Sequence, residues 1–232
     1  MNIIEIKGIC KTYDKKTLPV HALNGIDLNF QEGEFAAIVG PSGSGKTTLL
    51  NIIGGLDDPS EGEVVIDGVK ITELSGSKKT RFRMNNIGFV FQSFNLIPVF
   101  TAKENIEFIM QLQGRPKEER NKRTNELLKA VGLEDKTNSR PNKISGGQQQ
   151  RVAVARALAS KPKFILADEP TANLDSKSTE NLLDIMEQLN KEENITFIFS
   201  THDARVVNKA RRIITIEDGK VISDILKEKT NQ

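Results

Sequence analysis

Short apolar runs rich in Val, Ile and Phe recur along the chain, separated by longer segments with helical periodicity. The runs cover Phe35 to Val39, Phe164 to Ala167, Thr196 to Ser200 and Ile213 to Ile216. Continuous apolar runs of this length, alternating with helices, are typical of parallel strands that are buried on both faces of a sheet. The pattern therefore predicts an α/β protein with a mostly parallel core sheet.

The N-terminal third follows a different pattern. The segments IIEIKGI, IDLNF and GEVVIDG alternate between apolar and polar residues and are joined by Gly and Asp turns. Such alternation is typical of antiparallel strands with one buried face. We therefore expect an N-terminal antiparallel β subdomain beside the core sheet.

From about Ser93 to Lys143 the β pattern stops. The segments ENIEFIMQLQ and EERNKRTNELLKAVGL have helical periodicity, with a Gly-Arg-Pro break between them at residues 114–116, which is a strong stop signal for a helix. We expect an inserted α-helical subdomain over residues 93–144. The whole chain, residues 1–232, is then a single domain whose core takes up residues 1–92 and 145–232.

The charge balance narrows the classes of partner. Among 232 residues there are 33 Lys and Arg against 31 Asp and Glu, a net charge of +2, which gives no sign of nucleic-acid binding. Neither a membrane-spanning apolar run nor a signal-peptide layout is found, so a cytoplasmic location is expected. We interpret the single cysteine, Cys10, as a buried strand residue and His21 as a structural histidine.

The strongest motif is GPSGSGKT, residues 40–47, which fits the pattern GxxxxGK[ST] and lies between the strand FAAIV and the helical segment TLLNII. Its glycines allow backbone N–H groups to curl round phosphate oxygens, while Lys46 can reach the β- and γ-phosphates and the Thr47 hydroxyl can bind Mg²⁺. The motif predicts a P-loop NTPase fold. The expected phosphate cradle consists of Gly40, Ser42, Gly43, Ser44, Gly45, Lys46, Thr47 and Thr48.

Two carboxylates, Asp168 and Glu169, follow the apolar strand FILA. Asp168 is suited to hold Mg²⁺ through water, and Glu169 to polarise the water that attacks the γ-phosphate. A carboxylate pair at a strand end is by itself more often a solvated turn. The phosphate cradle upstream favours the catalytic interpretation here.

A third strand, ITFIFS, ends at Thr201-His202-Asp203. The carboxyl ends of parallel strands meet at one sheet edge, where open α/β sheets bind ligands. We therefore expect His202 to lie close to the two carboxylates, where its imidazole could bond a γ-phosphate oxygen.

The order of these motifs resembles the ATP-binding subunits of ABC transporters over nearly the whole chain: GPSGSGKTT, Gln92 in GFVFQSFNLIP, ISGGQQQR, FILADEP, NLD and THD. The resemblance implies that Tyr13 stacks on adenine, that Gln92 senses Mg²⁺ or the attacking water, and that Asp175 lies at a subunit interface. Each residue has a simpler alternative: Tyr13 could end a strand, Gln92 could be solvated, and Asp175 could cap the helix that begins near Ser176.

The segment KISGGQQQR has a glycine pair like that of a phosphate loop but no loop lysine. The resemblance implies head-to-tail pairing of two copies, so that Ser145, Gly146, Gly147 and a helix opened by Gln148 meet the γ-phosphate of ATP held by the other copy. Lys46, Gln92, Glu169 and His202 are the residues expected to act in hydrolysis. The motif begins with Ile144 where the family usually has Leu, a change of little expected effect.

Two segments, ALNGIDLNFQEGEFAAIVGPSGSGKTTLLNIIGGLD and GFVFQSFNLIPVFTAKENI, are similar to the branch of this family that contains the macrolide-exporter, lipoprotein-release and antimicrobial-peptide-resistance ATPases. This implies a separate membrane permease as partner, with Phe94 to Phe100 as the candidate contact surface, although most of these residues could simply pack the helical subdomain. The enzyme would then lie at the inner face of the cell membrane. A mechanotransmission complex that controls cell-wall remodelling stays open as an alternative, and a soluble ATPase acting on DNA or ribosomes is less favoured because heptads and a basic face are missing.

Overall fold

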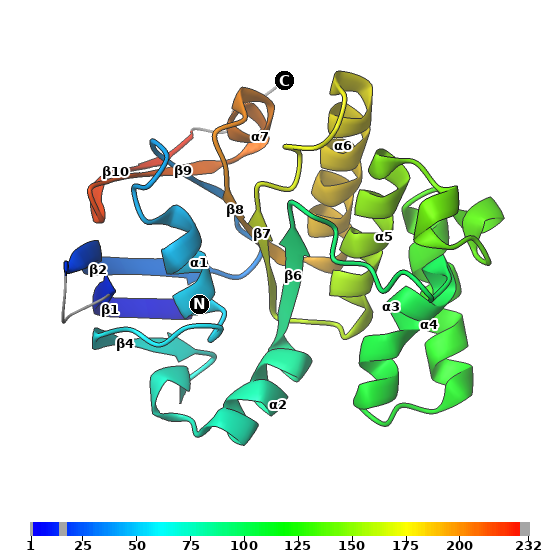
Figure 1. Cartoon of the computed structure of the whole chain (residues 1–232), viewed down its shortest axis with the longest axis horizontal. Coiled ribbons are helices and arrows are strands. Elements are labelled where there is room, and N and C mark those ends of the chain that lie inside the picture. Colours follow the sequence, from blue (N-terminus) through cyan, green and yellow to red (C-terminus); the bar gives the residue numbers. More distant parts are fainter. Residues whose placement is uncertain (1, 14–17, 228–232) are drawn as a thin grey trace.

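A computed structural model describes residues 2–13 and 18–227 of the chain, and within these residues the strands form two sheets (Figure 1). The strands are β1 (Asn2–Tyr13), β2 (Val20–Gln31), β3 (Phe35–Val39), β4 (Glu61–Ile66), β5 (Val69–Lys70), β6 (Ile87–Phe91), β7 (Phe164–Asp168), β8 (Thr196–Ser200), β9 (Arg212–Glu217) and β10 (Lys220–Leu226). The α-helices are α1 (Lys46–Ile53), α2 (Gly76–Asn86), α3 (Ala102–Leu112), α4 (Lys117–Ala130), α5 (Gly146–Ala159), α6 (Ser176–Glu193) and α7 (Ala204–Lys209). Short 3-10 helices cover Ile71–Glu73, Glu134–Lys136 and Pro141–Lys143.

The larger sheet has six strands in the order β10-β9-β3-β8-β7-β6. From β9 to β6 all neighbouring strands are parallel, whereas β10 runs antiparallel to β9 at the edge. The mostly parallel core sheet expected from the sequence is therefore confirmed. Because β3, β7 and β8 are parallel, the loops that follow them lie at the same edge of the sheet.

Alternate residues of the central strands point into two separate apolar cores. In β8, Phe197 and Phe199 pack with helices α3 to α6, whereas Ile198 packs with α1 and the smaller sheet. In β7, Ile165 faces the first core and Leu166 the second. Burial of both faces explains why these strands are continuous apolar runs in the sequence.

The smaller sheet is antiparallel, in the order β2-β1-β4-β5, as the N-terminal alternation predicts. Ile4 and Phe30 point into the core and are fully buried. Cys10, in contrast, is only half-buried and its thiol is free, so the prediction of a buried cysteine is wrong. The strand register shifts between Ile9 and Cys10, and such a bulge interrupts the regular alternation of inward and outward side chains.

The helices α3 and α4 lie at the side of the molecule away from the smaller sheet, and α5 lies between them and the six-stranded sheet (Figure 1). A capping box opens α3: the Thr101 hydroxyl accepts from the Glu104 N–H, and the Glu104 carboxylate accepts from the Thr101 N–H. The expected break follows at Gly114, whose φ is 75°. The regular elements within residues 93–144 are thus all helices, and the treatment of this segment as an inserted subdomain stays a prediction.

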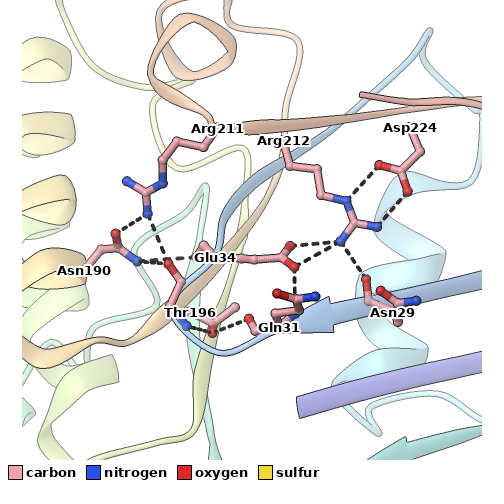
Figure 2. A network of polar contacts seen from close by, with 9 residues as sticks. Asn29, Gln31, Glu34, Asn190, Thr196, Arg211, Arg212 and Asp224 are labelled. Atoms are coloured by element: carbon pink, nitrogen blue, oxygen red, sulfur yellow. Dashed lines mark hydrogen bonds and ion pairs between the residues drawn. The ribbon is translucent and has the colours of Figure 1, made fainter. Parts of the chain in front are cut away.

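A polar network joins β9 and β10 to the start of β3, at the edge opposite the carboxyl ends of the parallel strands (Figure 2). Arg212 forms ion pairs with Glu34 at 2.9 Å and with Asp224 at 2.7 Å, and its guanidinium lies over the Phe30 ring. The hydrogen bond to Asp224 raises the pKa of Arg212, and Glu34 adds to this effect. Burial of the guanidinium acts in the opposite direction but is outweighed. This network anchors the last strand to the sheet.

Two strands of the larger sheet, β6 and β10, were not predicted from the apolar runs. The β10 segment is largely exposed and pairs with β9 along one side only, so it lacks a continuous apolar run.

Within the described residues, none of the helices has both the length and the apolar character that crossing a membrane requires.

Candidate active site

The phosphate cradle predicted at residues 40–48 lies between β3 and α1. Gly40, Gly43 and Gly45 have φ values of 149°, 81° and 103°, which L side chains rarely adopt. A Cβ atom on Gly40 would lie 2.0 Å from the Ile216 carbonyl oxygen, and one on Gly45 would lie 2.4 Å from the Ala22 carbonyl oxygen. Glycine is therefore required at these two positions for the loop to pack against β9 and β2.

Lys46 and Ser44 add polar groups to this loop. The Lys46 ammonium donates to the carbonyl oxygens of Gly40 and Pro41, both at 2.9 Å. Ser44 is 2% exposed, and its hydroxyl has no hydrogen-bond partner within the described residues. A buried hydroxyl without a partner is costly, and a phosphate oxygen bound to the loop would satisfy it. The loop thus fits a polyphosphate by its side chains as well as by its backbone.

A hydroxyl and a carboxylate meet at the first turn of α1. The Thr47 hydroxyl donates to Oδ1 of Asp168 at 3.1 Å, which joins α1 to the end of β7. Mg²⁺ prefers such oxygen ligands and keeps several water molecules, so one or two protein ligands suffice. Over residues 2–13 and 18–227 no group of three or more His, Cys, Asp or Glu could hold a metal. The pair Thr47 and Asp168 fits Mg²⁺.

Glu169 follows β7 in a left-handed conformation with a φ of 45°. Its Oε1 lies 2.7 Å from Nδ1 of His202, and its Oε2 accepts from the Thr201 hydroxyl at 3.2 Å. The adjacent strands β7 and β8 are in register, with Asp168 opposite Ser200, so their C-terminal loops meet. The structure therefore brings together the two carboxylates and the histidine, and Asp168 and Glu169 engage different partners.

The segment Ile144 to Arg151, which we call the signature segment, forms the start of α5. Ser145 is the N-cap and Gly146 the first residue, so the helix begins two residues before the predicted start at Gln148. The reason is a capping box: the Ser145 hydroxyl accepts from the Gln148 N–H at 3.3 Å, and the Gln148 side chain accepts from the Ser145 N–H at 2.9 Å. Within the described part of the chain, no hydrogen bond joins the signature segment to the phosphate cradle.

A polar hollow of about 260 Å³ adjoins the signature segment, between α5 and α6. It is lined by Ser145, Gly147, Gln148, Arg151, Lys177, Ser178 and Asn181. A Cβ atom on Gly147 would lie 2.8 Å from the Ser178 hydroxyl, so a side chain there would collide with α6.

Asp175 caps α6 by accepting a hydrogen bond from the Ser178 N–H at 2.9 Å. A second hydrogen bond, from the Ser178 hydroxyl, lowers the pKa of Asp175. The cap alternative for Asp175 is thus confirmed, and its role at an interface stays a prediction.

Gln92 and Tyr13 both have partly exposed positions. Gln92 follows β6, and its carbonyl oxygen accepts from the Asn173 side chain at 3.1 Å. Tyr13 ends β1 with 40% of its surface exposed, and its hydroxyl donates to Oδ2 of Asp57 at 2.7 Å. Their proposed contacts with Mg²⁺, water and adenine stay predictions.

The sequence matches a family model for ABC transporters over residues 23–172. The chain belongs to the ABC transporter family. It is an ATPase of the ATP-binding cassette type, with ATP and Mg²⁺ as its cofactors. The fold class predicted from the sequence agrees with that of solved ABC ATPase cassettes.

Three proteins are similar in sequence to this ABC ATPase over nearly its whole length. The uncharacterized ATP-binding protein MJ0796 of Methanocaldococcus jannaschii is 50% identical over 223 residues, 94% of this chain and 95% of the relative. A dimeric MJ0796 structure, a post-hydrolysis state bound to ADP and Pi, matches with a TM-score of 0.89 at 47% identity and covers 97% and 99% of the two chains. LolD 1 of Rhodopseudomonas palustris, from a lipoprotein-releasing system, is 47% identical over 95% of this chain and 98% of LolD 1. MacB of Campylobacter jejuni, a macrolide export ATP-binding/permease protein, is 44% identical over 99% of this chain but only 35% of MacB.

The structure of the ABC ATPase also reveals site residues that sequence reasoning missed. Gln150 in α5 is fully buried, and its amide donates to the carbonyl oxygens of Pro170, at 2.6 Å, and Phe91, at 3.2 Å. It thereby joins α5 to the end of β6 and to the loop after β7. The hydroxyl of Thr201 holds Glu169 in a similar way. Polar side chains are expected at the surface from composition, so no local signal in the sequence distinguished these two.

Proposed function

We propose that this ABC ATPase is the motor subunit of a transporter: two copies close head to tail around two ATP molecules and drive a separate membrane permease. One observation carries the proposal. Asp168 is bonded to Thr47 of the phosphate cradle, and the adjacent Glu169 is bonded to His202. The signature segment, in contrast, makes no hydrogen bond to that cradle within the described residues. A second copy would supply the signature segment that each cradle lacks.

In the proposed complex the cradle residues hold the phosphates of ATP. The backbone N–H groups of residues 42–48, together with the positive end of α1, would bind phosphate oxygens. Lys46 would exchange its carbonyl partners for the β- and γ-phosphates. Thr47 and Asp168 would hold Mg²⁺, which neutralises charge on the β- and γ-phosphate oxygens when bound.

Hydrolysis is assigned to the residues that follow β6, β7 and β8. Glu169 would orient a water molecule and accept its proton as the oxygen attacks the γ-phosphorus and ADP leaves. His202 approaches Glu169 through Nδ1, so its other ring nitrogen is available for a γ-phosphate oxygen. Gln92, on the exposed loop after β6, would contact Mg²⁺ or the attacking water.

The shared site follows from the chemistry of Ser145. Its oxygen accepts from the Gln148 N–H, so its own proton is free to be donated to a γ-phosphate oxygen of the other copy. The N–H groups of Gly146 and Gly147 and the positive end of α5 would add to this contact, with Asp175 at the same interface. ATP then favours the closed dimer, and loss of the γ-phosphate favours opening.

A groove between β6, α3 and α5 is the proposed seat of the permease. It has a volume of about 280 Å³ and is lined mainly by apolar side chains, among them Phe89, Phe91, Phe108 and Ile109. The loop Phe94 to Phe100 borders it through Asn95. A cytoplasmic helix of the permease would lie in this groove and hold the ATPase at the inner face of the cell membrane.

The proposed cargo is an amphiphilic compound or peptide that is exported or extracted from the membrane. Support comes from two relatives, since LolD 1 belongs to a lipoprotein-releasing system and MacB is a macrolide export ATP-binding/permease protein. The residues of this chain would not touch the cargo, so they do not specify it. Transport of a labelled amphiphile in reconstituted vesicles would separate this function from the alternative, mechanotransmission to cell-wall remodelling.

The test of the partner is photo-crosslinking in native membranes. A photoreactive phenylalanine in place of Phe108, which lines the groove, should crosslink to an integral membrane protein. The same group in place of Lys129, on the exposed side of α4, is the control and should give no such product. Recovery of the protein with ribosomes or DNA at moderate salt, with none on membranes, would contradict the proposal.

A further inference from the structure

The hydroxyl of Tyr13 belongs to a polar cluster with Asp57 and Lys11, two residues that have no role in the proposed function. Tyr13 donates to Oδ2 of Asp57 at 2.7 Å, and the Lys11 ammonium donates to Oδ1 of the same carboxylate at 2.7 Å. The Lys11 ammonium also lies 4.8 Å from the centroid of the Tyr13 ring, within the range of a cation–π contact. The ring is thus held at its hydroxyl by an anion and on one face by a cation.

The position of Asp57 is fixed by the helix that follows the phosphate cradle. The N–H groups of Leu56 and Asp57 both donate to the carbonyl oxygen of Asn51, at 2.8 and 3.2 Å, in the turn that ends α1. The Lys11 ammonium adds a bond to the Asp58 carbonyl oxygen at 2.6 Å. The cluster therefore ties the end of β1 to the C-terminal end of the helix whose N-terminal end belongs to the cradle.

The protonation behaviour of the cluster agrees with these contacts. Partial burial, and then the hydrogen bond to Asp57, raises the pKa of Tyr13, whereas Thr48 in the first turn of α1 acts in the opposite direction. Burial alone would raise the pKa of Asp57, but the hydrogen bonds from Lys11 and Tyr13 outweigh this effect and lower the pKa. Asp57 is thus a charged acceptor for a neutral phenol.

The Lys11 side chain is 13% exposed, and Tyr13 keeps 40% of its surface exposed. With one ring face covered by the ammonium, a planar base can stack only on the other face. A ring that is already fixed in place loses less conformational freedom when the base binds, which improves affinity.

We propose that Asp57 and Lys11 are positioning residues that fix the Tyr13 ring relative to the phosphate cradle and thereby set the affinity for the adenine nucleotide. This inference rests on the proposed contact between Tyr13 and adenine. It extends the nucleotide site to two residues that do not touch the phosphates.

ADP binding to the full-length chain, measured by calorimetry, tests the proposal, because ADP carries adenine but lacks the γ-phosphate that would close a dimer. Asp57→Ala, with Asp57→Asn as a second variant that keeps the side-chain volume, should weaken ADP binding about two- to tenfold, the range for one lost hydrogen bond. The KM for ATP should rise by the same factor while kcat at saturating ATP stays unchanged. Asp58→Ala is the matched control, because it removes the neighbouring carboxylate, which binds Lys79 rather than Tyr13.

A direct readout of the ring is available because the chain has one tyrosine and no tryptophan. The ultraviolet absorbance of the phenolate therefore reports Tyr13 alone. Asp57→Ala should lower the pKa of Tyr13, and Asp58→Ala should leave it unchanged. This titration checks that Asp57 holds the phenol, and the affinity for ADP checks whether that contact matters for nucleotide binding.

Tyr13→Leu separates the outcomes. This variant should bind ADP more weakly, and adding Asp57→Ala to it should have no further effect. An equal effect of Asp57→Ala with and without the ring would overturn the proposal, because Asp57 would then act without Tyr13. If Tyr13→Leu weakens ADP binding but neither Asp57 variant does, positioning is refuted and the adenine contact stands. Unchanged ADP binding in Tyr13→Leu would instead refute the proposed adenine contact itself.

Discussion

The Nδ1 atom of His202 lies 2.7 Å from the Oε1 atom of Glu169, although 33 positions separate the two residues in the chain. They meet because β7 and β8 are adjacent, parallel and in register up to Asp168 and Ser200. The side chain of His202 is 77% exposed and that of Glu169 only 19%. The histidine can therefore turn toward a ligand, whereas the carboxylate stays fixed.

Replacing Glu169 by Gln should preserve ATP binding and slow hydrolysis at least about 100-fold, because the amide cannot accept a proton from water. The variant should therefore run as a dimer on size exclusion in ATP and as a monomer in ADP. Glu118→Gln, on the exposed first turn of α4, is the control with normal turnover. Fast hydrolysis by Glu169→Gln would count against Glu169 as the base.

Thr201→Val should reduce kcat about three- to tenfold with little change in the KM for ATP, since valine keeps the volume but not the bond that holds Oε2 of Glu169. Steady-state kinetics measure the two constants separately. Thr201→Ser retains the hydroxyl and should recover most of the rate. Equal rates for the valine and serine variants would contradict a positioning role for the hydroxyl.

Removal of Arg212 should destabilise the fold without affecting the nucleotide site. The side chain is 9% exposed and binds Glu34 and Asp224 (Figure 2), so Arg212→Met should lower the free energy of unfolding by about 3 kcal/mol by leaving two carboxylates unpaired. Urea denaturation measures the loss, with the exposed Arg81→Met as control. An unfolding midpoint equal to that of the control would show that the network adds no stability.

Asp203 should contribute stability that depends on pH. Its bond to the Arg205 guanidinium, with further bonds from the Arg205 N–H and the Thr171 hydroxyl, lowers its pKa to about 2. Since the folded-state pKa lies below that of the unfolded chain, the contribution is complete above about pH 4 and is lost as the pH falls toward 2.

Asp203→Asn isolates this charge, because asparagine can still cap α7. The wild type should be more stable than the variant by about 1 kcal/mol at pH 7, given that the Arg205 partner is partly exposed. As the pH falls through 2, the difference in stability, measured in urea, should shrink toward zero. A difference that does not change with pH would mean that the charge of Asp203 is not the cause.

The parts of the site that could be predicted from sequence are those encoded locally. The cradle depends on glycines and a lysine within eight residues, and the strands before Asp168 and His202 are short apolar runs. The parallel order of these strands then placed their ends at one edge, as observed. Local sequence patterns, together with the rule that the carboxyl ends of parallel strands lie at one sheet edge, were sufficient to predict the cradle and the position of Asp168 and His202 beside it.

The remaining features depend on contacts between distant segments. The bond from Tyr13 to Asp57 spans 44 positions, and that from Arg212 to Asn29 spans 183. The strand β10 lacks an apolar run, and a bulge turns Cys10 partly outward. Neither periodicity nor motif spacing carries information on such features, because each depends on how separate segments pair and pack in three dimensions.

The measurement that tests the shared site most directly is size exclusion of Ser145→Arg in the Glu169→Gln background, combined with ATP binding. The parent should be a dimer in ATP. The added arginine should leave ATP bound to the monomer with nearly unchanged affinity and abolish the dimer, while Ser77→Arg, on the exposed surface of α2, should leave the dimer intact. Loss of nucleotide binding by the Ser145→Arg monomer would contradict the account, because the signature segment would then belong to the site of its own chain.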